Sequence, residues 1–189
     1  MIISPIAIVV KNPGLEFIEF MDKFKNSDIK NNPYLIIDDS SDDEKSIDLL
    51  YSNKAVDFEG RKILGVKGQY TIIKTPSNLG KLYRILFAMN SVFKLFPTAE
   101  TCIIIDGPQQ IEKEWQPGFI SEYRNKKHLL PISMVSSSKT NKIHLFTNIF
   151  YKKLKKIGYF STADIKGVGS IYMILQKISN SIGFSVLTI

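Results

Sequence analysis

The 189-residue sequence has one cysteine, Cys102, so it cannot form a disulfide within the chain. That excludes a disulfide-stapled secreted scaffold and a cysteine-rich zinc module, and it fits a reducing, cytoplasmic compartment. Long apolar runs are also missing. The longest stretch without a charged residue is the twelve residues 178–189, well short of the roughly 20 that span a bilayer. Residues 1–10 are apolar but lack a basic leader and a cleavage site, which indicates a first strand rather than a signal peptide.

Acidic residues are scarce in the last third of the chain. Residues 126–177 hold ten lysines and one acid, Asp164, for a net charge of +9, whereas residues 1–125 carry −2. With 44% hydrophobic and 23% charged residues, the composition is that of a folded chain, and the length suits a single domain over residues 1–189. The basic block can attract nucleic acid, anionic lipid or phosphorylated ligands, and a solvated helix face remains the alternative.

Short apolar runs alternate with segments of helical periodicity. The residues around Gly60, Gly65 and Gly68 follow neither pattern clearly. The predicted strands cover residues 6–10, 34–37, 70–73, 102–105, 130–135 and 184–189. The predicted helices follow residues 14, 42 and 78, and two more cover about 141–157 and 170–179.

Strands alternating with helices predict an α/β fold with a parallel sheet covered on both sides. Ligands of such sheets bind at the carboxyl ends of the strands. Three polar clusters lie at those ends by sequence: Asp38-Asp39-Ser40, Ser77-Asn78 and Asp106-Gly107. We therefore expect segments far apart in the chain to meet in one crevice.

Four segments taken in order, residues 6–10, 35–42, 75–81 and 103–110, resemble the nucleotide-sugar-binding half of family-2 glycosyltransferases. The pattern is most similar to the dolichyl- and polyprenyl-phosphate sugar synthases, and it extends over residues 5–175. A helix with Asn148, followed by Asp164 and Gly167, continues it. The resemblance implies a GT-A fold, which is a three-layer sandwich around a central, mostly parallel sheet.

The resemblance also implies residues for the donor. Asp39, with Asp38 beside it, would accept hydrogen bonds from the N–H groups of the base or from a ribose hydroxyl. Asn78 and Lys81 would lie near the donor, where a helix N-terminus favours anions. Capping or turn formation by the aspartates, and an exposed helix position for Lys81, are the alternatives.

Asp106 matches the first residue of the family's Asp-x-Asp motif, which holds a divalent metal on the diphosphate. The second aspartate is replaced here by Pro108, which has no ligand to offer. Gln110 matches a glutamine of the polyprenyl-phosphate synthases, so Asp106 and Gln110 are the candidate ligands for magnesium or manganese. A metal-independent or inactive site is the alternative.

Asp164 matches the aspartate that takes the acceptor proton in family members that glycosylate a hydroxyl. A lipid phosphate is already an anion and needs no base, in which case Asp164 would orient the acceptor or a lysine. A salt bridge with Lys166 is the structural alternative.

The segment 141–157 predicts a basic amphipathic helix. Its apolar stripe is Ile143, Phe146, Phe150, Leu154 and Ile157, and its cluster of lysines is Lys152, Lys153, Lys155 and Lys156. Such a helix either rests on an anionic membrane or packs on a core with a lysine-rich outer face. His128 and His144 have no metal-ligand spacing, which indicates structural roles.

Together these features predict an inverting hexosyltransferase that moves a sugar from a nucleoside diphosphate to a polyprenyl phosphate or a glycan. We expect a cytoplasmic protein that works at the inner membrane surface when the acceptor is a lipid. One alternative is a non-catalytic nucleotide-sugar-binding relative. Another is a nucleic-acid-binding domain, disfavoured because the basic block contains no arginine and no known binding motif occurs.

Overall fold

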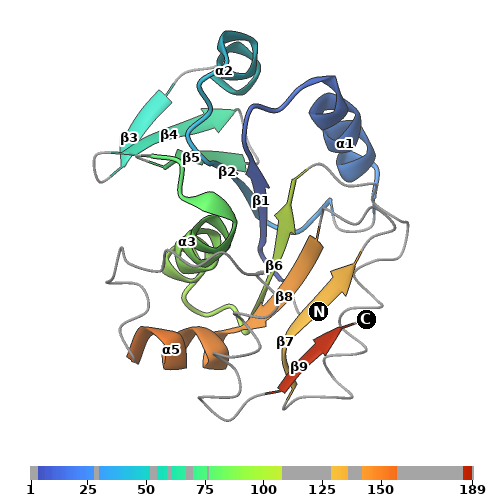
Figure 1. Ribbon diagram of the computed structural model, residues 1–189, viewed down its shortest axis with the longest axis vertical. Helices are drawn as coiled ribbons and strands as arrows, with labels where there is room; N and C mark the ends of the chain where they lie inside the picture. Colours follow the sequence, from blue (N-terminus) through green and yellow to red (C-terminus); the bar gives the residue numbers. More distant parts are fainter. Residues whose placement is uncertain are drawn as a thin grey trace.

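The computed structural model describes residues 4–27, 30–51, 55–58, 61–66, 70–75, 77–107, 129–135, 142–156 and 185–188. Within these ranges the chain forms a nine-stranded sheet with helices packed against it (Figure 1). The strands are β1 (Ile6–Val10), β2 (Tyr34–Asp38), β3 (Ala55–Phe58), β4 (Arg61–Val66), β5 (Tyr70–Lys74), β6 (Thr101–Asp106), β7 (Leu129–Val135), β8 (Lys142–Thr147) and β9 (Ser185–Thr188). The helices are α1 (Leu15–Lys25), α2 (Glu44–Tyr51), α3 (Gly80–Leu95) and α5 (Asn148–Lys156).

The sheet has the strand order β3-β4-β5-β2-β1-β6-β8-β7-β9. Its central strands β5, β2, β1 and β6 are all parallel to one another. In register, Val10 of β1 lies beside Asp38 of β2, and Val9 lies beside Asp106 of β6. The central strands therefore end together at one edge, with aspartates at the ends of both neighbours of β1.

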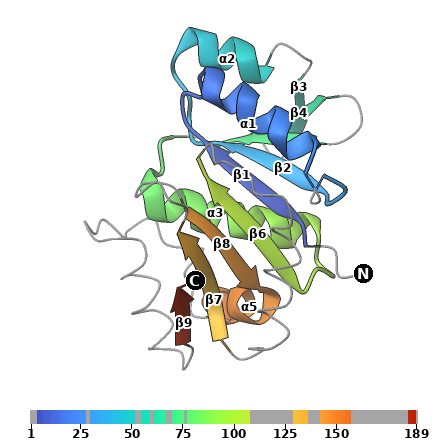
Figure 2. The ribbon, with the colours of Figure 1, turned by 90° about the vertical axis from the view of Figure 1, so that its right-hand side faces the viewer.

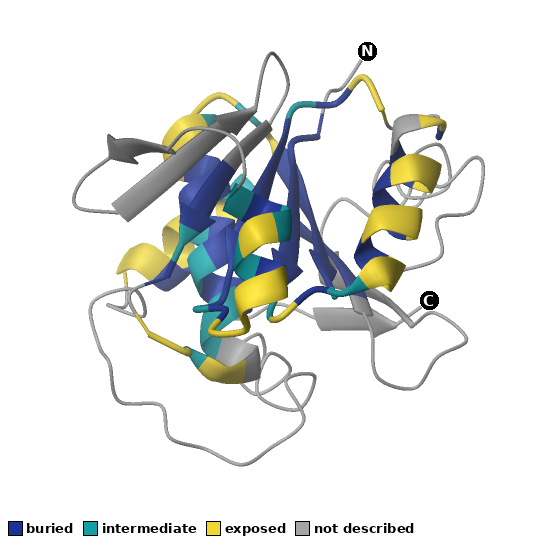
Figure 3. Cartoon of the chain, turned by 90° about the horizontal axis from the view of Figure 1, so that it is seen from above, coloured by how far each residue is buried: buried dark blue, intermediate teal, exposed yellow. Residues whose placement is uncertain are grey.

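The central strands are buried on both faces, because helices cover each side (Figures 2 and 3). Ile6 and Ile8 pack with the aromatic face of α1, whereas Ala7 and Val9 pack with α3 and α5. This alternation follows from the two-residue repeat of a strand. Each fully buried Ile, Leu or Phe side chain contributes about 1.5–3 kcal/mol to stability. The resulting three layers confirm the expected α/β architecture.

The segment between α2 and β5 is more regular than the sequence suggested. β3 and β4 pair as antiparallel strands, and β4 extends the sheet by pairing with β5. Two residues, Glu59 and Gly60, separate the strands, which is the length of the commonest hairpin connection. The prediction took this glycine as a sign of irregularity, although a glycine between two short strands is also a hairpin signal.

The prediction of one helix over 141–157 is wrong in its first part. Residues 142–147 form strand β8, and α5 begins at Asn148. β8 pairs antiparallel with β6, so that Ile143 lies beside Ile105 and Phe146 beside Cys102. Both faces of β8 are buried, and a run that is apolar on both faces carries no alternation to separate it from a helix.

The remaining predicted elements agree with the structure where it describes them. β7 and β9 coincide with the strands expected at 130–135 and 184–189. The helix expected at 170–179 lies outside the described residues. Across the described ranges, no helix combines the length and the hydrophobicity that crossing a membrane requires.

Candidate functional site

The carboxyl edge of the central strands gathers three buried aspartates, Asp38, Asp39 and Asp106. Backbone hydrogen bonds fix their positions: the N–H of Asp39 donates to the carbonyl of Val10 at 2.8 Å, and that of Gly107 to the carbonyl of Val9 at 2.8 Å. Two of the three polar clusters predicted at the strand ends, Asp38-Asp39-Ser40 and Asp106-Gly107, therefore lie on either side of the end of β1. Burying a carboxylate is costly unless hydrogen bonds or positive charges compensate it, so the partners of each aspartate show what it can do.

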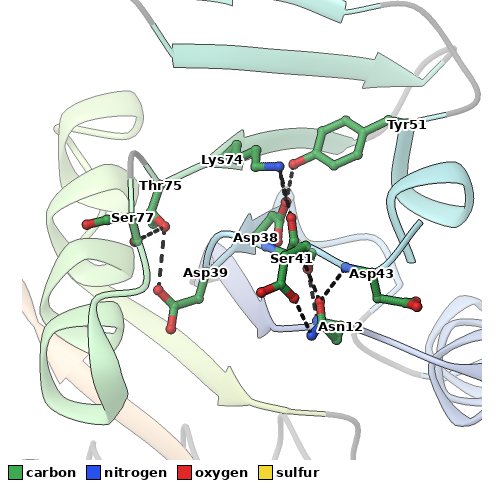
Figure 4. Close-up of polar contacts among 10 residues, drawn as sticks. Asn12, Asp38, Asp39, Ser41, Asp43, Tyr51, Lys74, Thr75 and Ser77 are labelled. Atoms are coloured by element: carbon green, nitrogen blue, oxygen red, sulfur yellow. Dashed lines mark hydrogen bonds and ion pairs between the residues drawn. The ribbon is translucent and has the colours of Figure 1, made fainter. Parts of the chain in front are cut away.

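Asp38 faces α2, and hydrogen bonds to its carboxylate hold the loop after β2 in place (Figure 4). Its Oδ1 accepts the N–H of Ser41 at 2.8 Å, and its Oδ2 accepts the hydroxyl of Tyr51. Lys74 Nζ lies 4.0 Å from the same Oδ2 and donates to the Ser41 carbonyl at 3.1 Å. Burial, together with the Asp38 carboxylate, raises the pKa of Tyr51 above its usual range. These contacts favour the turn-forming role for Asp38.

The loop after β2 is also tied to the loop after β1. Asn12 donates from its backbone N–H to Ser41 Oγ at 2.9 Å and from its side chain to Asp42 at 2.8 Å. Asn12 adopts a φ of 45° and Ser40 a φ of 57°, a region that few residues other than glycine enter. Asp43 caps α2 by accepting the N–H of Ser46 at 2.9 Å. The two loops that border the site are therefore held to each other.

Asp39 faces α3, on the other side of the sheet edge from Asp38. Its Oδ1 accepts the N–H of Leu79 at 2.7 Å, with the Thr75 hydroxyl at 3.4 Å. Its Oδ2 lies 3.8 Å from Arg84 Nη1. Burial raises the pKa of Asp39, although the Leu79 N–H and the charges of Arg84 and Lys11 oppose that change. The carboxylate thus joins the end of β2 to the start of α3.

Arg84 is the residue that the sequence analysis missed. It lies on α3, and its Nη2 is 2.6 Å from Asp106 Oδ1, while Nη1 faces Asp39. The guanidinium therefore bridges the two buried carboxylates that face α3. The available signal is its position: Arg84 is four residues before Ala88 and eight before Val92, both fully buried on the same stripe of α3. A charged side chain on the buried side of a helix is rarely found without a partner of opposite charge, so this position predicts a buried acid nearby.

Asn78 lies just before α3 and is exposed. Its Oδ1 accepts the N–H of Gly80 at 3.1 Å, so it satisfies a free donor at the start of the helix. Gly80 has a φ of 73°, which explains a glycine at this position. The side chain of Lys81 lies outside the described part of the structure, as do Gln110 and Asp164. Their predicted roles as a donor contact, a metal ligand and a general base therefore stay predictions.

A metal centre is not formed by the residues that the structure describes. Within those ranges, no three His, Cys, Asp or Glu side chains converge in a way that would hold an ion. Asp106, the candidate ligand, is instead in contact with Arg84. His144 is buried in β8 and stacks on Phe146, with ring centres 5.9 Å apart, as a structural residue would.

The burial of the side chains on α5 distinguishes the two interpretations of the basic segment, which were a helix on a membrane and a helix packed on the core. Phe150, Tyr151 and Leu154 are buried and pack with α3 and β6 as part of one core. The apolar stripe is thus not an exposed face, and the idea that it lies in a membrane is wrong for these positions. The lysines Lys152, Lys153, Lys155 and Lys156 are exposed on the outer side of the helix.

Several solved structures share this fold. A Desulfovibrio desulfuricans G20 protein described as a nucleotide-diphospho-sugar transferase matches with a TM-score of 0.58 and 12% identity, over 98% of this chain and 79% of that one. The mannosyltransferase PcManGT from Pyrobaculum calidifontis, solved with GDP-Man and Mn²⁺, matches with a TM-score of 0.62 and 13% identity, over 98% and 54%. TarS 1–349 from S. aureus matches with a TM-score of 0.53 and 12% identity, over 88% and 52%.

These likenesses establish the fold. The chain has the GT-A architecture of nucleotide-sugar transferases, as the sequence predicted. It spans about half the length of PcManGT and of the TarS structure. No protein-family model and no curated protein sequence matches the chain.

Proposed function

We propose that the chain binds a nucleoside-diphosphate sugar and transfers its sugar to an acceptor with inversion. The observation that carries this proposal is the Asp39–Arg84–Asp106 cluster at the carboxyl edge of the central parallel strands. Ligands of α/β sheets bind at that edge. The GT-A fold, shared with a mannosyltransferase solved with GDP-Man, supports the choice of ligand.

The residues of the cluster suit the parts of such a donor. Asp39 and Asp106 present carboxylate oxygens that can accept hydrogen bonds from a base N–H or a ribose hydroxyl. Arg84 presents a planar cation suited to phosphate oxygens. Helix α3 begins beside the cluster with no acidic residue in its first turn, and the positive end of its dipole favours an anion there. The diphosphate would thus lie between Arg84 and the start of α3.

The transfer itself needs an acceptor group that attacks the anomeric carbon while the nucleoside diphosphate leaves. For a glycan hydroxyl, Asp164 would take the proton; for a polyprenyl phosphate, the attacking oxygen is already ionised. The lysines of the basic block would then attract the acceptor phosphate. A polyprenyl phosphate is therefore the acceptor that the charge distribution favours.

A non-catalytic nucleotide-sugar-binding protein is the second candidate, and Pro108 is the observation that favours it. Such a protein would bind the donor through the same cluster and release no nucleoside diphosphate. Following that release with and without added polyprenyl phosphate separates the two functions.

We predict that nucleoside diphosphates and their sugars stabilise the protein. At a concentration 100 times the Kd, a ligand adds about 2.7 kcal/mol to the free energy of unfolding, which raises Tm by roughly 5–10 °C for a chain of this size. The measurement is a thermal-shift panel of UDP, GDP and their sugars. Asp106→Asn should abolish most of the shift, whereas Asp43→Asn, at the cap of α2, should keep it. A panel in which millimolar nucleotide never raises Tm would contradict the proposal.

We also propose that the exposed lysines of α5 bring the protein to an anionic membrane. Each lysine near such a surface contributes about 1 kcal/mol of attraction. Replacing Lys152, Lys153, Lys155 and Lys156 by glutamine should therefore reduce co-sedimentation with phosphatidylserine vesicles by more than tenfold at low salt.

The control replaces two lysines away from α5, Lys23 and Lys45, which are exposed on α1 and α2, and it should leave vesicle binding nearly unchanged. Equal binding by the wild-type and the α5 variant would refute the membrane contact. Binding of the wild-type to single-stranded DNA but not to vesicles would favour nucleic acid instead.

A further inference from the structure

The buried acids of the site do not fit a divalent metal. Magnesium and manganese are held by several oxygen ligands that carry surplus negative charge. Among the described residues, Asp106 is the one carboxylate of the motif, and its Oδ1 is 2.6 Å from Arg84 Nη2. The position of the second carboxylate is occupied by Pro108, which has no ligand atom in its side chain. A metal at Asp106 would meet a guanidinium instead of a second carboxylate.

Charge compensation at the sheet edge leads to the same conclusion. Lys74 lies by Asp38, and Arg84 lies between Asp39 and Asp106. The charge of Lys11, at the end of β1, also acts on Asp39. Three buried carboxylates are therefore matched by three cations of the chain itself. Among the residues that the structure describes, an arriving metal ion would find no surplus negative charge at this edge, and the nearby guanidinium would repel it.

Arg84 retains capacity to bind an anion. Its Nε is buried and makes no hydrogen bond within the described part of the structure. Its Nη1 lies 3.8 Å from Asp39 Oδ2, which is too long for a hydrogen bond. Its side chain is 23% exposed, so it is reachable from solvent. A guanidinium binds phosphate oxygens through paired, charge-assisted hydrogen bonds.

We propose that Arg84 takes the place of the divalent cation, so that the site binds a nucleoside diphosphate without any metal ion. This inference rests on the proposed donor-binding function and specifies how that site neutralises the diphosphate. In this arrangement Asp106 holds Arg84 in place and accepts hydrogen bonds, rather than coordinating a metal.

The first test is calorimetric titration of the full chain with UDP and with GDP, in EDTA and again in Mn²⁺. We expect the same Kd, within about twofold, in both conditions for the nucleotide that binds. Binding that requires Mn²⁺ would overturn this inference and leave the proposed function standing. No binding of either nucleotide in both conditions would overturn the two together.

The second test asks whether Arg84 is the cation responsible. Arg84→Lys keeps the charge but loses the planar pair of donors, so it should weaken nucleotide binding in EDTA by roughly tenfold, and Mn²⁺ should not restore it. Lys94→Gln, at an exposed position of the same helix, is the matched control and should bind as the wild-type does. Unchanged affinity in a folded Arg84→Lys variant would overturn the inference, as would its recovery by Mn²⁺.

Discussion

Replacing Arg84 with methionine is expected to lower the free energy of unfolding at pH 7 by about 3 kcal/mol. The side chain of Arg84 is mostly buried between Asp39 and Asp106, which are 0% and 1% exposed. Removing one partner of a buried ion pair leaves the other charge uncompensated, and such changes cost about 3–5 kcal/mol. The lower end applies because Arg84 is partly reachable by water. Urea unfolding followed by circular dichroism measures the difference.

The loss should depend on pH in a defined direction. Burial already raises the pKa of Asp39 above its ordinary 3.8, and removing the nearby cation raises it further. A native-state pKa above the unfolded value means that the native state binds more protons, so stability falls as pH rises. The Arg84→Met variant should therefore be closest to the wild-type near pH 4 and furthest from it near pH 7.

Two further variants make this result specific to the carboxylates. Lys94→Met changes an exposed lysine of the same helix and should alter stability by less than about 0.5 kcal/mol. Adding Asp39→Asn and Asp106→Asn to Arg84→Met removes the uncompensated charges and should recover much of the lost stability. An Arg84→Met variant as stable as the wild-type at neutral pH would show that the guanidinium does not compensate these acids.

The dependence on Arg84 also shows what the sequence could not reveal. The expectation that strand ends meet is confirmed for Asp39 and Asp106, because the ends of parallel strands share one edge of the sheet. Their roles in donor binding stay predictions. Arg84 comes 45 residues after Asp39 and 22 before Asp106. The helical position of Arg84 indicates a buried acid nearby, but only the packing of α3 on the sheet shows that Asp39 and Asp106 are its partners.

Two neighbouring residues, the last of β2 and the one that follows it, illustrate a finer limit. Asp38 and Asp39 look equivalent in the sequence, but successive side chains leave a strand on opposite sides. Asp38 therefore meets Tyr51 and the loop after β2, whereas Asp39 meets α3. Alternation predicts that the two side chains point to opposite sides, but which of them meets Arg84 depends on the packing of α3 at that edge.

The error at β8 has a different physical cause. Ile143, Leu145 and Phe146 are all buried because the strand is covered on both faces. Without exposed positions, the two-residue repeat of a strand disappears from the sequence. The spacing of Ile143, Phe146 and Phe150 then matches a helix by coincidence. The first two residues belong to β8, whereas Phe150 belongs to α5. The lysines that follow reinforced that interpretation, because they do belong to a helix.

Replacing Phe150 with alanine is expected to lower the free energy of unfolding by about 3–5 kcal/mol, the cost of emptying a buried aromatic site. Phe150 is 0% exposed on α5 and stacks on Phe146 with ring centres 5.8 Å apart. It also belongs to the core that joins α5 to α3 and to the central strands. Urea unfolding of the variant beside the wild-type measures the loss.

The neighbouring Ile149 provides the control, because it is 58% exposed on the same helix. Ile149→Ala should change stability by less than about 0.5 kcal/mol. If the apolar stripe of α5 instead served a membrane, Phe150→Ala would leave the soluble protein stable and weaken vesicle binding. A core role predicts the reverse: the folded fraction of Phe150→Ala binds vesicles as the wild-type does, since the lysines that face solvent are unchanged. The two measurements together therefore separate the buried face of α5 from its charged one.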